Sequence, residues 1–136
     1  MTAPTADEIR NEPASCRLDA WVAEFVMGWN VSLFDEDAET IYYKGGYIVY
    51  PHTHFGVPWT PSEDIAAAMQ VLEKAMEDRY LYVAMFYDSV TWEVEISDGE
   101  GKVIKGGSSL LEPIINPSLE LAICRAALLA ALERPA

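Results

Sequence analysis

The sequence contains little cysteine, no signal peptide and no long apolar run, and each shortage excludes a class of protein. Two cysteines in 136 residues, Cys16 and Cys124, are too few for the disulfide framework of a small secreted domain. No apolar stretch reaches the roughly 20 residues that span a bilayer. The polar start MTAPTADEIRNEP lacks the apolar segment of a signal peptide. We therefore expect a cytoplasmic protein with no membrane partner, in which both cysteines are buried and reduced.

Positive charge is also scarce. Nine basic residues stand against 22 acidic ones, which gives a net charge of −13. A field of that sign repels duplex nucleic acid, so we do not expect DNA or RNA binding. A small anionic ligand remains compatible, because a few buried arginines can dominate one pocket. The alternative is an acidic protein-binding inhibitor, or one that imitates DNA to block a host defence protein.

Catalytic signatures are missing as well. The sequence has no Walker P-loop, no GxGxxG, no GxSxG and no HExxH. Paired carboxylates such as Glu93 and Glu95 are expected on so acidic a chain and are typical of a solvated face. His52 and His54 share one face of an extended segment, but two ligands make a weak metal signal. We expect no enzyme activity, no metal and no cofactor.

What is present is enough apolar material for one core. An apolar fraction of 51% over this length suits a single domain. Residues 1–14 show no periodic apolar pattern and predict a flexible tail, so that residues 15–136 form the domain. Apolar residues at helical spacing predict a helix from Ser15, its N-cap, to about Met27, with Gly28 ending it.

Two further helices have clear start signals. Thr60 followed by Pro61 and Glu63 reads as a capping box with proline at the first helical position. The spacing places four apolar side chains on the buried face of this helix: Ile65, Met69, Leu72 and Met76. Asn116 followed by a proline predicts the start of the last helix, which runs to about Leu132.

Strand patterns fill the segments between the helices. Aromatic and β-branched runs on both sides of a Gly-Gly pair predict a hairpin over residues 41–50. Alternating apolar and polar residues predict three antiparallel strands at 80–87, 91–97 and 102–108. The order α, β-hairpin, α, βββ, α predicts an α+β fold in which an antiparallel sheet is layered between helices, an α-β-α sandwich.

The last helix carries the most informative residue. Between Leu121 and Leu132 every residue is apolar except Arg125, and a helix that is apolar all round is buried all round. In so small a domain this favours a subunit interface, so we expect a homo-oligomer, a dimer or a multiple of dimers. A buried guanidinium must be neutralised, either by a carboxylate of the chain or by an anionic ligand such as a diphosphate.

Four segments together resemble the phage ABA sandwich domain family, small phage proteins with helices on both sides of a sheet. They are LDAWVAEFVMGW at 18–29, PSEDIAAAMQVLEK at 61–74, WEVEI at 92–96 and LAICRAALLAAL at 121–132. The chain is also similar to the first-type Thoeris anti-defence proteins. That likeness implies a phage sponge in an infected bacterium, which binds cyclic ADP-ribose isomers, and in some cases cyclic oligonucleotides, and withholds them without cleavage.

The same resemblance assigns candidate ligand-binding residues. Arg125 matches the arginine-bearing position of the last helix, and aromatic residues of the central strands would stack on the base. The predicted set is Arg125, Phe86, Tyr87, Trp92, Asn116 and Arg79. A doubly charged ligand favours a second cation, for which Lys102 and Lys105 are the candidates.

Overall fold

The computed structural model describes residues 2–31, 42–44, 47–49, 57–77, 80, 82–98, 100–109 and 118–133. Its helical elements are α1 (Ala6–Asn11), α2 (Cys16–Trp21), the π-helical η1 (Val22–Val26), α3 (Ile65–Met76) and α4 (Leu119–Leu132). Its strands are β1 (Asn30–Val31), β2 (Tyr42–Lys44), β3 (Tyr47–Val49), β4 (Val57–Pro58), β5 (Tyr82–Tyr87), β6 (Thr91–Ser97) and β7 (Val103–Ser109). The fold is α+β, as the sequence predicted.

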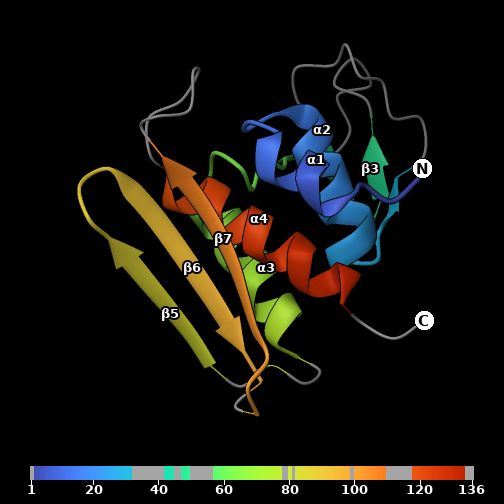
Figure 1. The fold of residues 1–136 in the computed structure, drawn as a ribbon. Helices are drawn as coiled ribbons and strands as arrows, with labels where there is room; N and C mark the ends of the chain where they lie inside the picture. Colours follow the sequence, from blue (N-terminus) through green and yellow to red (C-terminus); the bar gives the residue numbers. More distant parts are fainter. Residues whose placement is uncertain are drawn as a thin grey trace.

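Three antiparallel strands in the order β5-β6-β7 form the main sheet, and α4 lies across one of its faces (Figure 1). Val94, Ile96 and Ile104 point toward α4 and are buried. The opposite face carries charge: Lys105 Nζ lies 3.3 Å from Glu95 Oε1 and 3.9 Å from Glu93 Oε1. The predicted alternation of buried and polar positions is therefore confirmed. Among the described elements, the helices gather on the α4 side.

The helix α4 is the centre of the core. All ten residues from Leu121 to Ala130 are buried, because β6 and β7 cover one side of the helix while α1, α2, η1 and α3 cover the others. The prediction of all-round burial is confirmed, but the covering elements belong to the same chain. The reason for expecting a subunit interface at α4 is thereby removed, and the homo-oligomer stays a prediction.

The amino-terminal segment differs from the predicted flexible tail over residues 1–14. Residues 6–11 form α1, which begins with a capping box between Thr5 and Glu8. Ile9 is fully buried against the core, and this anchors a helix too short to be stable alone. The tail prediction failed because one buried isoleucine gives no periodic pattern to detect.

The first predicted long helix is confirmed as α2 continued by η1. Ser15 Oγ accepts the Leu18 N–H at 3.1 Å, so Ser15 is the N-cap. Gly28 has φ +73°, the left-handed conformation that stops the helix. The π-helical turn appears in the hydrogen bonds, since the Met27 N–H donates to the Val22 carbonyl five residues back.

The predicted start of the second helix was wrong, and its buried face was predicted only in part. Its N-cap is Asp64, whose Oδ1 accepts the Ala66 N–H at 3.2 Å, whereas Thr60 begins a separate turn. The reason is tertiary: the Ser62 N–H donates to Asp19 Oδ1 at 2.9 Å, which fixes the turn outside the helix. The buried face holds Ala67, Ala68, Val71, Leu72 and Ala75, while Ile65 and Met69 are exposed.

The hairpin is present as the antiparallel pair β2–β3, with residues 45–46 outside the described ranges. The last helix has Ser118 rather than Asn116 as its N-cap, and Ser118 Oγ accepts the Leu121 N–H at 3.1 Å. Both cysteines are buried and free of a disulfide. None of the helices in the described part of the chain is long and apolar enough to cross a bilayer.

Candidate functional site

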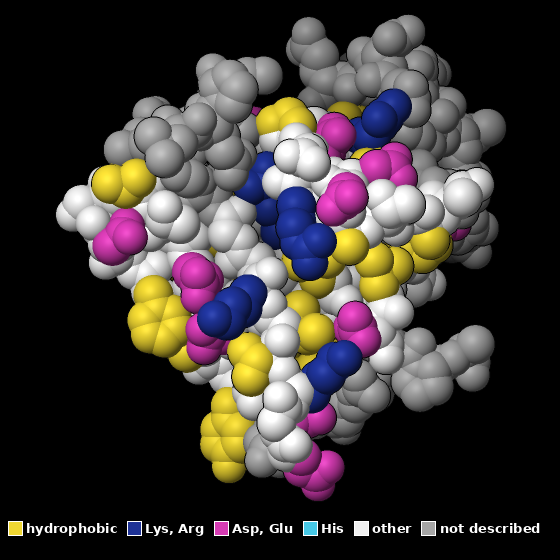
Figure 2. Space-filling model, viewed as in Figure 1, with side chains coloured by type: hydrophobic (Ala, Val, Ile, Leu, Met, Phe, Trp, Pro, Cys, Tyr) yellow, Lys and Arg dark blue, Asp and Glu magenta, His cyan; other side chains and the backbone are white. Residues whose placement is uncertain are grey.

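A groove with two cations on its walls lies where α1, the start of β7 and the end of α4 meet. Its volume is about 360 Å³, within the usual range for small-molecule sites. The lining residues are Ala6, Arg10, Gly101, Lys102, Val103, Ile104, Leu129, Leu132 and Glu133. Figure 2 shows dark blue side chains on either side of an apolar yellow surface near the centre of the view.

Local structure places both cations. Arg10 sits in the last turn of α1, which the burial of Ile9 holds against α4. Lys102 directly precedes β7, after a turn in which Asp98 Oδ1 accepts the Glu100 and Lys102 N–H groups. Gly101 permits that turn because its φ is +105°. The hairpin turn and α1 therefore bring two cations from distant parts of the sequence to one groove.

The cations are accessible and only weakly held. Lys102 Nζ lies 2.8 Å from Glu133 Oε2, and the two side chains are 43% and 45% exposed. Arg10 Nη1 lies 3.7 Å from Asp7 Oδ1, and Asp7 is almost fully exposed. Surface ion pairs of this kind contribute at most about 1 kcal/mol. An incoming anion can therefore replace either carboxylate, while Leu129, Leu132 and Val103 offer an apolar floor.

Arg125 does not open into this groove. Its side chain is 2% exposed, Nη1 donates to the Gly107 carbonyl at 2.6 Å, and Nη2 donates to the Glu12 carbonyl at 2.8 Å. These contacts join α4 to the end of β7 and to the segment after α1. The described contacts of Arg125 are thus structural, and its role as an anion clamp stays a prediction.

The aromatic candidates divide between two faces of the sheet. Tyr87 stacks on Trp92, with ring centroids 4.7 Å apart and planes 27° apart. Phe86 directly precedes Tyr87 on β5, and its side chain points to the opposite face of the sheet, because successive side chains of a strand alternate. The structure brings Tyr87 and Trp92 together but not Phe86. Asn116 and Arg79 lie outside the described residues.

The sequence reasoning missed a second buried charge. Asp19 is 2% exposed and accepts the Ser62 N–H. Burial raises the pKa of Asp19 to about 7, the hydrogen bonds from Ser62 oppose the rise, and nearby Glu63 adds to it. Asp19 shares the helix face of Val22 and Val26, so the reasoning applied to Arg125 would also have found it.

The buried thiol of Cys124 lies close enough to Asp19 for the two groups to interact electrostatically. Burial raises the pKa of Cys124 well above its ordinary value, and the carboxylates of Asp19 and Glu120 raise it further. A thiol in this setting stays protonated and is a poor nucleophile. Within the described residues, no group of three or more His, Cys, Asp or Glu side chains can hold a metal ion. His52 and His54 lie outside those residues.

We expect the buried charge of Asp19 to make stability fall as the pH rises from about 4 to about 7. The folded protein binds a proton in that range which the unfolded chain, with an ordinary carboxyl pKa, releases. Asp19→Asn keeps an acceptor for Ser62 and removes the charge. At pH 8 it should raise the unfolding free energy by on the order of 3–4 kcal/mol. Urea titrations of both proteins at pH 5 and pH 8 measure this, and a parallel pH dependence would contradict it.

Comparison with known proteins places the fold in a family. The model of the Phage ABA sandwich domain matches residues 20–128. The chain belongs to this family. The ABA sandwich match covers the whole β5-β6-β7 sheet and most of α4, but it leaves out α1 and the last turn of α4. Arg10, Leu129, Leu132 and Glu133 of the groove therefore lie outside the shared ABA sandwich region. No curated protein and no solved structure matches the chain.

Proposed function

We propose that this ABA sandwich protein is a phage anti-defence sponge. It binds a cyclic nucleotide-type immune signal, such as a cyclic ADP-ribose isomer, in the groove between α1, β7 and α4, and withholds it without cleaving it. The observation that carries the proposal is a groove with Arg10 and Lys102 over an apolar floor, on a chain of net charge −13. Family membership is consistent with a phage protein.

The chemistry of the groove suits such a ligand. A guanidinium gives a phosphate two parallel hydrogen bonds, and an ammonium adds a point charge. An apolar floor accepts the face of a base or ribose. The carboxyl end of α4 lies at this groove, and the helix dipole places partial negative charge there, which opposes an anion. The two cations must therefore supply the attraction for an anionic ligand.

We expect the double variant Arg10→Ala/Lys102→Ala to bind cyclic ADP-ribose isomers at least tenfold more weakly than the wild type. One charge-assisted contact is worth about 1.5–3 kcal/mol, and both side chains are exposed enough to be removed without loss of fold. Isothermal titration calorimetry measures the affinities. Lys74→Ala, which removes an exposed lysine of α3 paired with Glu77, is the matched control and should bind normally. Equal affinity in the double variant would place the ligand elsewhere.

The net charge of −13 supports a second candidate, an acidic inhibitor that binds a host defence protein or imitates DNA. An inhibitor of this kind would bind no cyclic nucleotide, and its affinity for its protein partner would fall as the salt concentration rises. Binding of no cyclic nucleotide by the wild type, together with salt-sensitive capture of one host protein, would favour it over the sponge.

A further inference from the structure

The two cations of the groove have different surroundings. Arg10 Nη1 lies 3.7 Å from Asp7 Oδ1, but Asp7 is almost fully exposed and does not line the groove. Lys102 Nζ lies 2.8 Å from Glu133 Oε2, and Glu133 does line the groove. Among the described residues that line it, Glu133 alone carries a carboxylate. The groove therefore has a cationic side at Arg10 and a mixed side, which we define as the Lys102–Glu133 pair.

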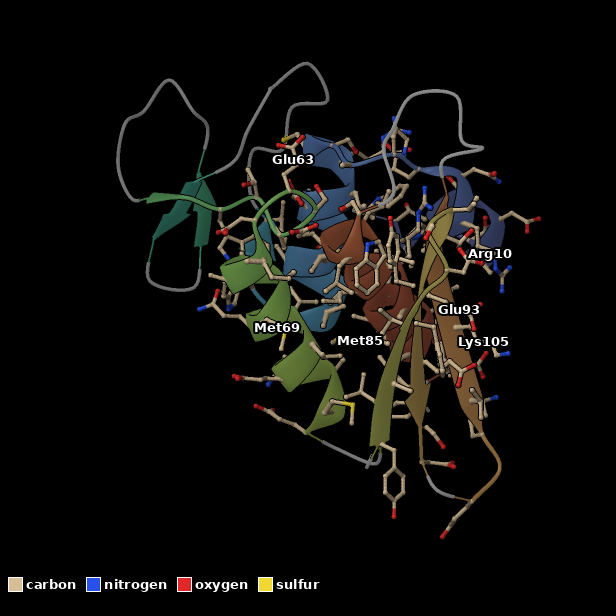
Figure 3. All side chains as sticks on the ribbon, turned by 90° about the vertical axis from the view of Figure 1, so that its left-hand side faces the viewer. Arg10, Glu63, Met69, Met85, Glu93 and Lys105 are labelled. Atoms are coloured by element: carbon tan, nitrogen blue, oxygen red, sulfur yellow. The ribbon has the colours of Figure 1, made fainter. Side chains whose placement is uncertain are left out.

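Lys105, the lysine within β7, does not add to the charge of the groove. Ile104 lines the groove, so the next side chain of the strand points to the opposite face of the sheet. There Lys105 Nζ lies 3.9 Å from Glu93 Oε1. Figure 3 shows Lys105 and Glu93 together on the sheet, with Arg10 of α1 above them. Within the described part of the chain, the cations that line the groove are thus Arg10 and Lys102.

The mixed side disfavours an anion. A phosphate oxygen that approaches Lys102 also approaches the Glu133 carboxylate, and the two negative charges repel each other. Glu133 is also the C-cap of α4, where the helix dipole places partial negative charge. Arg10 belongs to α1, and its guanidinium offers a phosphate two parallel hydrogen bonds. A phosphate is therefore bound best at Arg10.

A group that binds between Lys102 and Glu133 must both accept and donate hydrogen bonds. An ammonium group only donates, and an ionised carboxylate only accepts. A hydroxyl does both, so that it can accept from Lys102 Nζ and donate to a Glu133 carboxylate oxygen at the same time. The oxygens of a phosphate are acceptors and have no proton for the carboxylate. The mixed side thus fits a neutral alcohol better than an anion.

We propose that Glu133 is a specificity-determining residue of the groove. Together with Lys102 it binds a free hydroxyl of the ligand's ribose, while Arg10 binds the phosphate. Carboxylates bind ribose hydroxyls in this way in dinucleotide-binding proteins. The groove then prefers ribonucleotides with a free ribose hydroxyl over bare diphosphate and over their deoxy analogues. This inference rests on the proposed function, because it takes the groove as the nucleotide site.

Analogues of the ligand test the hydroxyl contact in the wild type. The probes are one cyclic ADP-ribose isomer and two analogues of it, each with the free hydroxyls of one ribose replaced by hydrogen. Isothermal titration calorimetry of the full chain should show that one analogue binds about tenfold more weakly or worse, because a charge-assisted hydrogen bond is lost. Full affinity for both analogues would overturn this inference and leave the sponge intact. No binding of the parent compound would overturn both.

The variant Glu133→Ala tests whether this residue makes the contact. It should reduce the preference for the parent compound over the weaker analogue from tenfold to about threefold or less. It should also strengthen the binding of inorganic pyrophosphate, because the repelling carboxylate is gone. A structural role alone would weaken the binding of both probes together. Glu133→Gln keeps an oxygen that accepts from a hydroxyl, so its preference should be intermediate. An undiminished preference in Glu133→Ala would overturn the inference.

Glu77→Ala is the matched control. Glu77 is the C-cap of α3, as Glu133 is of α4, and Glu77 Oε2 also lies close to a lysine, 2.9 Å from Lys74 Nζ. This variant removes the same kind of group outside the groove, so the hydroxyl preference and the pyrophosphate affinity should equal those of the wild type. Circular dichroism shows whether each variant is folded. An equal loss of preference in Glu77→Ala would contradict the role of Glu133.

Discussion

We expect Gly106→Ala to lower the unfolding free energy by about 3 kcal/mol or more, the upper end of the range for overpacking a core. Gly106 lies on β7 against α4. A Cβ atom there would be 2.7 Å from the Ala122 carbonyl oxygen and from the Ala126 Cα, and closer still to the Ala126 amide nitrogen. Real Cβ atoms do not come so near to backbone, so β7 must move away from α4.

The clash of Gly106→Ala is with the backbone of α4, so that shortening a side chain of the helix cannot relieve it. Adding Ala126→Gly should not restore stability, because removing that side chain leaves the clashing backbone in place. Gly107→Ala is the neighbouring control, since its Cβ meets the Trp92 carbonyl oxygen at 3.3 Å and the helix not at all. It should cost less than about 1.5 kcal/mol. Urea unfolding of the four proteins gives the comparison, and equal losses at Gly106 and Gly107 would contradict the close packing.

Removal of Arg125 should have a comparable effect. Arg125→Ala leaves the carbonyls of Gly107 and Glu12 without these donors and opens a cavity beside α4. We expect a loss of about 3–5 kcal/mol in unfolding free energy, typical of breaking a buried polar network. Arg125→Lys should lose an intermediate amount of unfolding free energy, because one ammonium group cannot donate to both carbonyls as the guanidinium does.

Arg125→Ala also separates two roles for this residue. If the residue holds α4, β7 and the segment after α1 together, chemical denaturation of the ligand-free variant shows the loss. If its main role is to bind an anion, the ligand-free variant keeps its stability and calorimetry shows lost affinity. A variant with unchanged stability and lost binding would contradict the structural role.

Much of the fold could be predicted from local patterns. The alternation of Trp92, Val94 and Ile96 with polar residues predicted the central strand and its buried face. The apolar run after Leu121 predicted a fully buried helix. These patterns are strong because the buried residues recur at the period of the element that carries them. Gly28 and Ser15 are local signals too, since the conformation at a helix end depends on few neighbours.

Long-range contacts account for what was missed. The hydrogen bond from Ser62 to Asp19 moves the start of α3 to Asp64 and joins residues 43 positions apart. The single buried side chain of Ile9 anchors α1, which no periodicity could reveal. The alanines of α3 form much of its buried face, although the larger side chains Ile65 and Met69 predicted a different face. In each case a tertiary contact overrides a valid local preference.

The candidate site was less predictable than the fold. The sequence points to Arg125 because it is the one charged residue between Leu121 and Leu132. The groove instead uses Arg10 from a segment predicted to be a flexible tail, and Lys102 from a turn. The sequence indicates Lys102 only as a candidate second cation beside Arg125. No local pattern places α1 beside β7, since that neighbourhood arises from packing on α4.

The central claim is that the groove holds an intact anionic nucleotide, and a heat-release experiment tests it most directly. The protein is incubated with a cyclic ADP-ribose isomer, freed of unbound ligand, denatured by heat and analysed by liquid chromatography with mass spectrometry. The wild type should release the ligand unchanged, and Arg10→Ala/Lys102→Ala should release little. Recovery of a hydrolysed product, of nothing from the wild type, or of equal amounts from both proteins would contradict the claim.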